Sequence, residues 1–172
     1  LDLLALKKST SVYLPHKVLP MLPPILSEEM CSLKEGVDRY SYVFKLHLDL
    51  ENLSVKKAEL FEAIINSHKN FSYGRIDRVI EGHLDQYSKV EKEIFDYLIP
   101  FYEISKKYRA KRLLKGYDFR TSENRLKLKN SNLESIDVEI STASHQLVEE
   151  CMLLANIEAS KKVNTVGIYR IH

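Results

Sequence analysis

The sequence of 172 residues predicts an α+β fold in which antiparallel sheets and hairpins pack with helices. Three observations carry this prediction. Apolar and polar residues alternate over 40–50, apolar residues recur at helical spacing over 90–113, and short strand-like runs flank both segments. The predicted order is strand, hairpin, helix, long helix, hairpin, helix and strand, in one compact piece.

The first part of the chain combines strand-forming and helix-breaking residues. Residues 2–8 are expected to form a short helix, and the run STSVYL at 9–14 has the β-branched and aromatic residues typical of a strand. Proline fixes φ and lacks a backbone donor, so the four prolines that follow predict an extended loop or edge over 15–26. Residues 27–33 are expected to add one helical turn.

The middle of the chain has the clearest periodicity. In RYSYVFKLHLDL at 39–50, six apolar side chains alternate with five others, which predicts a half-buried strand. A turn near 51–53 and the run VKKAELFEAIINS at 55–67 predict an antiparallel partner for it. A short helix is predicted at 72–81.

A long helix is predicted from the capping-box pair Ser88 and Glu91 to about Leu114. Pro100 lies inside it and removes one backbone hydrogen bond, so a kink is expected there. Beyond the helix, strands are predicted at 117–119, 125–129 and 133–140, with a hairpin turn at 130–132, and a second helix at 144–163 precedes a strand that ends in YRIH at 169–172.

Positive charge is concentrated between Lys106 and Lys129. This window holds ten basic and two acidic residues, a local net charge of +8 in a chain whose net charge is only +2. Such asymmetry favours a polyanionic partner. A solvated helix face rich in lysine would give the same composition, and this alternative stays open.

Three aromatic residues lie outside the apolar stripes: Tyr13, Tyr73 and Phe119. Exposed rings among cations would suit single-stranded nucleic acid, because bases stack on rings while cations neutralise phosphates. The alternative is that all three rings are buried in the core. No G-x-S-x-G, P-loop, H-E-x-x-H or dinucleotide motif occurs. His145 and Glu149 are spaced to bind a metal ion side by side on a helix, but no third ligand accompanies them.

Three long blocks resemble, in the same order, the RNB domain of the ribonuclease II and ribonuclease R family, and ribonuclease R more than ribonuclease II. They are TSVYLPHKVLPMLPPILSEEMCSLKEGVDR at 10–39, NSHKNFSYGRI at 66–76, and HQLVEECMLLANIEASKKV at 145–163 followed by IYRIH. The resemblance covers essentially the whole chain and is weakest from Asp85 to Lys115. It implies that residues 1–172 are the central part of one RNB domain.

The resemblance implies an enzyme that threads single-stranded RNA from its 3′ end and releases 5′-nucleoside monophosphates processively with Mg²⁺. Tyr13 matches the tyrosine that packs on the terminal bases, and Phe119 matches the phenylalanine on the other side of the base stack. Tyr73 and Glu149 match residues near the ribose that help the family to prefer RNA over DNA. The proline segment is expected to hold Tyr13 rigidly.

The aspartate cluster that holds magnesium in the family is expected upstream of Leu1, and an arginine segment that stabilises the leaving phosphate is expected after His172. Neither motif occurs in these 172 residues. The isolated fragment is therefore expected to contain no catalytic residue, to bind no metal and to be inactive, with Mg²⁺ acting in the parent enzyme. Two alternatives remain: a non-catalytic RNA-binding or protein-docking module, and a metal-dependent enzyme built on His145 and Glu149.

The resemblance also implies a cytoplasmic protein that works with RNA-decay machinery such as a helicase or the ribosome. Its two cysteines, Cys31 and Cys151, are expected to be reduced and buried. No apolar run is long enough to span a bilayer, so no membrane partner is expected.

Overall fold

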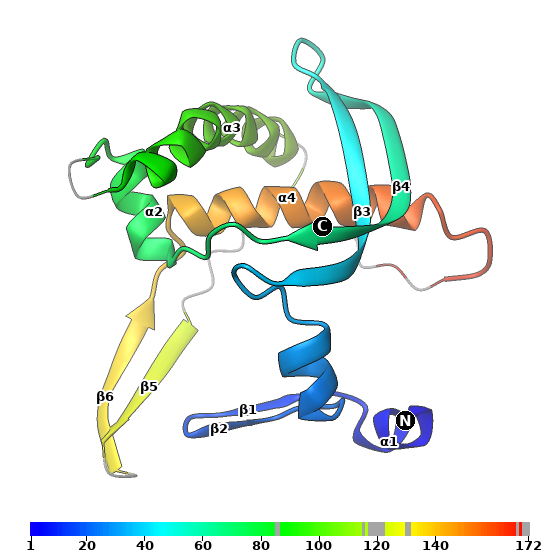
Figure 1. Ribbon diagram of the computed structural model, residues 1–172, viewed down its shortest axis with the longest axis vertical. Coiled ribbons are helices and arrows are strands. Elements are labelled where there is room, and N and C mark those ends of the chain that lie inside the picture. Colours follow the sequence, from blue (N-terminus) through cyan, green and yellow to red (C-terminus); the bar gives the residue numbers. More distant parts are fainter. Residues whose placement is uncertain (85–86, 115, 117–122, 130–131, 168, 170–172) are drawn as a thin grey trace. The chain divides into compact units, whose positions relative to one another are not determined.

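The computed structural model describes residues 1–84, 87–114, 116, 123–129, 132–167 and 169, and it combines helices with antiparallel hairpins, as predicted (Figure 1). The sequence predicted one compact piece, but the contacts divide the chain into two compact units. Unit 1 comprises Leu1–Tyr42, Glu62–Asn70 and Thr121–Ile140, and unit 2 comprises Val43–Phe61, Phe71–Arg120 and Ser141–His172.

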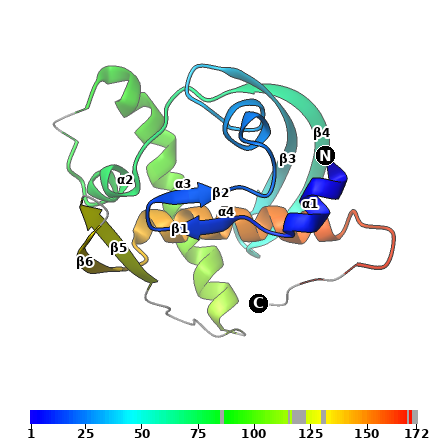
Figure 2. The same cartoon turned by 90° about the horizontal axis from the view of Figure 1, so that it is seen from below.

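Unit 1 begins with the predicted helix, α1 (Asp2–Lys8), followed by β1 (Val12–Leu14) and β2 (Lys17–Leu19). The two strands form an antiparallel hairpin, drawn in blue in Figure 2. The proline segment is thus an edge strand over part of its length. It then enters a π-helix, η1 (Ile25–Met30), so the prediction of extended backbone up to 26 is wrong at its end. Two prolines directly precede η1, where a missing N–H costs no helical hydrogen bond.

The predicted central hairpin is confirmed by β3 (Asp38–Asp49) and β4 (Ser54–Asn66), which form a two-stranded sheet. Pairs across the strands show that they run antiparallel: Asn66 Nδ2 donates to Asp38 Oδ1 at 2.6 Å, and Tyr42 Oη donates to Glu62 Oε1 at 3.0 Å. The base of this hairpin belongs to unit 1 and its tip to unit 2.

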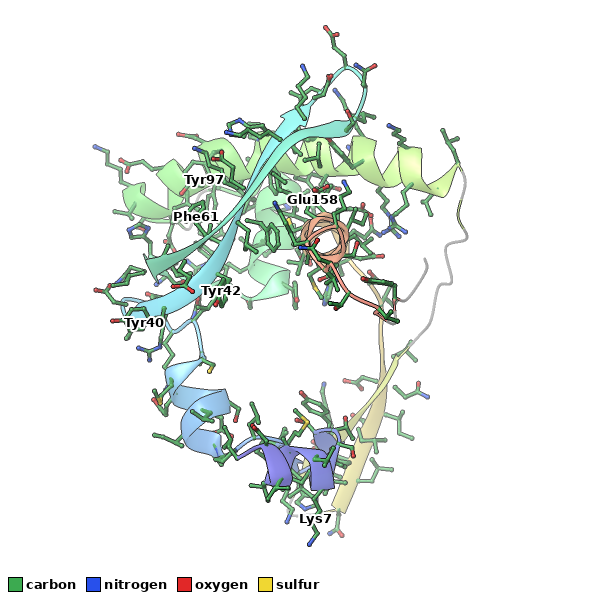
Figure 3. All side chains as sticks on the ribbon, turned by 90° about the vertical axis from the view of Figure 1, so that its right-hand side faces the viewer. Lys7, Tyr40, Tyr42, Phe61, Tyr97 and Glu158 are labelled. Carbon is green, nitrogen blue, oxygen red and sulfur yellow. The ribbon has the colours of Figure 1, made fainter. Side chains whose placement is uncertain are left out.

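The predicted half-burial of β3 holds over only part of the strand. Tyr40 and Tyr42, labelled in Figure 3, are 89% and 74% exposed. Phe44, Leu46 and Leu48 of the alternating face are partly buried, but Leu50, beyond the end of β3, is exposed. Phe61 on β4 is also exposed.

Unit 2 is built on three helices, α2 (Tyr73–Ile80), α3 (Lys89–Leu113) and α4 (Ala143–Ser160). All three were predicted, and α4 contacts both of the others (Figure 1). Ser88 and Glu91 form the predicted capping box, which satisfies backbone N–H groups at the start of α3. Val79 and Phe95 are almost completely buried, and the Phe71 and Tyr87 rings pack on Phe95.

The far end of α3 holds the tip of the central hairpin within unit 2. The Tyr108 hydroxyl donates to the carbonyl of Ser54 at 3.0 Å, and Lys111 Nζ donates to the carbonyls of Asn52 and Leu53 at 2.7 and 2.9 Å. These hydrogen bonds fix the hairpin tip to α3.

The second predicted hairpin is confirmed by β5 (Glu123–Lys129) and β6 (Asn132–Glu139), an antiparallel pair in unit 1. Its turn and the predicted strand at 117–119 lie outside the described residues, as does most of the strand predicted at 169–172. Among the described residues, no helix combines the length and apolar character that crossing a bilayer requires.

Candidate nucleic-acid interface

Tyr13 projects from the middle of the short hairpin in unit 1. It pairs with Val18 across the strands, and it is 79% exposed, so the alternative of a buried core ring is wrong for this residue. The base of the hairpin is closed by two further contacts: the Met21 N–H donates to Ser11 Oγ, and Lys8 Nζ donates to the carbonyl of Pro20, both at 3.0 Å. The ring is therefore available for stacking on a locally supported strand.

Tyr73 is the first residue of α2 in unit 2, and its ring stacks on that of His145. The ring centroids are 3.7 Å apart and the planes differ by 20°. Tyr73 remains 45% exposed, so it too is not a core ring. A hollow of about 340 Å³ lies at the start of the same helix, lined by Ser72, Gly74, Arg75, Arg78 and Tyr87.

His145 lies in the first turn of α4, where it takes part in a capping box with Thr142. The Thr142 N–H donates to His145 Nδ1 at 3.4 Å, and the Thr142 hydroxyl lies 2.7 Å from the same nitrogen. These contacts fix the imidazole ring on one edge, and Tyr73 covers one of its faces.

Asp77 joins α2 to the start of α4. Its Oδ1 accepts the Ser144 N–H at 2.9 Å, and Ser144 Oγ donates to the carbonyl of Tyr73 at 3.2 Å. Burial of Asp77 disfavours the charged carboxylate, but hydrogen bonds from Ser144 and Thr142 outweigh burial, so the pKa of Asp77 lies below its ordinary value. The ionised carboxylate thus helps to fix Tyr73 against α4.

Glu149 follows His145 by one helical turn and therefore lies on the same face of α4. Its two carboxylate oxygens contact two arginines of α3: Arg109 Nη1 lies 2.8 Å from Oε2, and Arg112 Nη2 lies 3.2 Å from Oε1. The Glu149 side chain is still 45% exposed. The neighbouring Glu150 is buried and contacts the same arginines.

The structure thus stacks Tyr73 of α2 on His145 of α4, one helical turn from Glu149, although Tyr73 and Glu149 are 76 positions apart in the sequence. Tyr13 belongs to the other unit. Phe119 lies outside the described residues. Sequence reasoning missed Arg109, Arg112 and Asp77, because nothing in the local pattern reveals which carboxylate or amide a side chain meets on another helix.

The basic window has fewer free charges than its composition indicated. Most of its described cations contact acceptors within the chain: Lys106, Arg109, Lys111, Arg112, Lys127 and Lys129. This window alone therefore indicates a polyanionic partner only weakly, and the candidate interface consists of Tyr13, Tyr73 and Glu149.

A metal site at His145 and Glu149 finds no support in the geometry. Thr142 contacts Nδ1 of the histidine, and both oxygens of the glutamate contact arginine. Within the described ranges, no group of three or more His, Cys, Asp or Glu side chains is arranged to hold a metal ion. The expectation for the cysteines is half right, because both are free but Cys31 is exposed and only Cys151 is partly buried.

Comparison with known proteins gives a consistent family. The sequence pattern of the RNB domain matches residues 1–172. Ribonuclease R of Helicobacter pylori is 35% identical over 177 residues, which cover all of this chain and 26% of that protein. The chain therefore spans about a quarter of the length of this curated relative.

Solved structures of similar fold include members of the same family. The Mycoplasma genitalium RNase R in complex with ribose-methylated single-stranded RNA matches 94% of this chain and 26% of its own, with a TM-score of 0.81 and 25% identity. Yeast Ssd1, described as a pseudonuclease, matches 94% of this chain and 19% of its own, with a TM-score of 0.63 and 20% identity. The second likeness concerns the fold alone.

Proposed function

We propose, since this chain belongs to the RNB domain family, that it supplies RNA-channel residues to a processive 3′-to-5′ exoribonuclease that hydrolyses single-stranded RNA to 5′-nucleoside monophosphates. Relatives named ribonuclease R, matched over the whole of this chain and about a quarter of their own length, support the proposal. The activity then belongs to a longer protein that contains these residues, called the complete protein below.

The arrangement of Tyr73, His145 and Glu149 is the observation that carries this proposal. A 2′-hydroxyl can donate to the exposed carboxylate of Glu149 while the sugar lies against the partly exposed Tyr73 ring. Because DNA lacks that hydroxyl, these two residues would favour RNA. Tyr13 and Phe119 are proposed to stack on the bases, a contact that is indifferent to the sugar.

Mg²⁺ is part of the proposed activity, since it can activate water and stabilise the leaving oxygen. In the part of this chain that the structure describes, the acidic and imidazole side chains do not form a group that fits such an ion. We therefore derive no hydrolytic step from these residues. The proposal assigns the metal-binding aspartates to a preceding part of the complete protein.

Hydrolysis of single-stranded RNA tests the proposal directly. Poly(A) with Mg²⁺ is incubated with the purified 172-residue chain and, separately, with the complete protein. We expect 5′-adenosine monophosphate to be released by the complete protein and not by the chain alone. Nucleotide release by the chain alone would contradict the assignment of catalysis to another segment.

The second candidate is a non-catalytic RNA-binding or protein-docking module. The similarity in fold to yeast Ssd1, which is described as a pseudonuclease, favours this alternative. A complete protein that binds poly(A) but releases no nucleotide at any Mg²⁺ concentration would establish this alternative. The codons that precede Leu1 offer a second discrimination, because only the enzyme requires clustered aspartates there.

We further propose that the complete protein acts in the cytoplasm together with RNA-decay machinery such as a helicase or the ribosome. The free thiols of Cys31 and Cys151 support a reducing compartment. Sedimentation of a cell extract through a sucrose gradient tests the ribosome partner. The complete protein is expected to cosediment with ribosomal particles. If an extract of cells undergoing RNA decay yields the protein only at the top of the gradient, the ribosome is not its partner.

A further inference from the structure

We infer that Arg109 and Arg112 are positioning residues for Glu149: they orient its carboxylate toward the ribose and neutralise its charge beside the RNA backbone. This inference rests on the proposed function, in which Glu149 reads the 2′-hydroxyl. It adds two residues of α3 to the determinants of RNA preference.

The contacts define a network of two arginines and two glutamates between α3 and α4. Arg109 Nη1 lies 2.8 Å from Glu149 Oε2 and 3.5 Å from Glu150 Oε1. Arg112 Nη2 lies 3.2 Å from Glu149 Oε1 and 2.5 Å from Glu150 Oε1. The arginine side chains are 14% and 25% exposed and that of Glu150 only 5%, so water screens the pairs with Glu150 far less than it screens a surface ion pair, whereas the pairs with the 45% exposed Glu149 are screened more.

The network leaves Glu149 able to bind a ligand. A carboxylate has about four lone-pair sites on its two oxygens. Arg109 contacts one oxygen and Arg112 the other, so each oxygen retains accepting capacity, and the Glu149 side chain remains almost half exposed. Since both contacts fix the carboxylate before RNA arrives, little rotamer freedom is lost on binding.

The two arginines also reduce the electrostatic repulsion between Glu149 and the phosphates of bound RNA. An isolated carboxylate beside a phosphate backbone repels it, which would oppose the binding that the ribose contact favours. In these contacts two arginine charges face two glutamate charges, so the negative charge of Glu149 is offset while its oxygens can still accept hydrogen bonds.

The backbone that carries the arginines is well supported. Arg109 and Arg112 are three residues apart and so project from one side of α3. Tyr108, between α3 and the hairpin tip, is buried and donates to the Ser54 carbonyl. This part of α3 is therefore fixed within unit 2, as a positioning role requires.

Binding of poly(A) and poly(dA) to the complete protein, without Mg²⁺ so that no RNA is cleaved, tests the inference. The main variant is Arg109→Ala, because Arg112 still pairs with the buried Glu150 in it. We expect the ratio of DNA to RNA dissociation constants to fall at least about fivefold, as expected for coupled neighbours. Arg109→Lys, which keeps the charge, should restore part of the ratio. Lys92→Ala, an exposed residue of α3, is the matched control and should leave the ratio unchanged.

A double-mutant cycle and a salt titration separate positioning from direct phosphate contact. If Arg109 acts through Glu149, Arg109→Ala should change the ratio little in a Glu149→Gln background, and the salt dependence of binding should keep its slope. A direct phosphate contact would instead weaken RNA and DNA equally and reduce that slope, which would overturn the inference. An unchanged ratio in a folded Arg109→Ala protein would overturn it as well.

The folding of the variants and the proposed function of Glu149 are checked by separate measurements. Circular dichroism of each variant shows whether α3 and α4 remain intact. Should Arg109→Ala unfold, Arg109→Met replaces it, because this variant keeps much of the aliphatic side chain and leaves Glu149 in place. It should retain RNA binding but lose part of the preference for RNA, and retention of the full preference in folded Arg109→Met would overturn the inference. An unaltered protein that binds poly(A) and poly(dA) equally would contradict the proposed function itself.

Discussion

The hairpin that carries Tyr13 and the helical cluster that carries Tyr73 and Glu149 hold their side chains in different ways. The hairpin consists of exposed three-residue strands whose partners are close in sequence. The cluster depends on contacts between distant residues: Arg112 to Glu149 spans 37 positions, Asp77 to Ser144 spans 67, and Ser144 to Tyr73 spans 71.

This difference matches the two tasks that we propose. Stacking on a base needs an accessible ring and tolerates small shifts, because every base has a face to stack on. Reading one hydroxyl requires an acceptor at a fixed position, which a network across three helices can provide. Changes in the cluster should therefore affect stability or RNA preference, whereas changes at the hairpin should affect affinity alone.

The largest effect is expected from the core of the cluster. Phe95→Ala removes a ring that is 1% exposed and packs against Phe71 and Tyr87, so we expect a loss of about 3–5 kcal/mol in the free energy of unfolding. Urea denaturation followed by circular dichroism measures it. Tyr97→Ala, at an exposed position on the same helix, is the control and should cost little. Equal losses in both variants would show that Phe95 does not form a core in solution.

The second largest effect is expected on nucleic-acid affinity, from the loss of Tyr13 in the β1–β2 hairpin. Tyr13→Ala should leave stability nearly unchanged, because the ring is mostly exposed. It should weaken binding of poly(A) and poly(dA) alike, by about 1–3 kcal/mol, since stacking does not distinguish the sugars. Phe119→Ala is expected to do the same, and both variants should change the length of the shortest RNA that the complete protein leaves undigested. If both variants keep the affinity and the end products of the unaltered protein, neither ring contacts the bound RNA.

A smaller, pH-dependent effect is expected at Asp77. Because its pKa is lowered in the folded protein, Asp77 stabilises the fold above the ordinary aspartate pKa of about 3.9, and this contribution is lost as the pH falls through the folded value. Asp77→Ala should therefore cost about 1 kcal/mol at pH 7 and progressively less in acid. Thermal unfolding at a series of pH values checks this, with Asp96→Ala as the exposed control. A cost that does not change with pH would mean that the charge of Asp77 is not involved.

The sequence could predict those parts of the fold that depend on local pattern. The strand at β3, the Ser88 capping box and the start of α2 are set by neighbouring residues, and the structure confirms them, although the predicted buried face of β3 holds over only part of the strand. The start of η1 was missed because proline is tolerated before a helix as well as in extended segments.

The candidate site could be predicted only in part. The rings of Tyr13, Tyr73 and Phe119 stood out because they lie outside the apolar stripes, and their proposed roles, like that of Glu149, came from the resemblance to a family. Arg109 and Arg112 were counted as part of a basic window, although they neutralise glutamates on α4. Which charges pair is decided by the packing of α3 against α4, and the spacing of residues along one helix does not specify that packing.

The most direct test of the proposed ribose-reading role of Tyr73 and Glu149 compares poly(A) with poly(dA) binding in Tyr73→Ala, Glu149→Gln and the double variant. Glu93→Gln, an exposed glutamate of α3, serves as the control. The complete protein should prefer poly(A), and the preference should fall about tenfold or more in Glu149→Gln, since a hydrogen bond to a charged group contributes about 1.5–3 kcal/mol. The double variant should bind both polymers nearly equally. A preference for poly(A) that survives in the folded double variant would contradict the account.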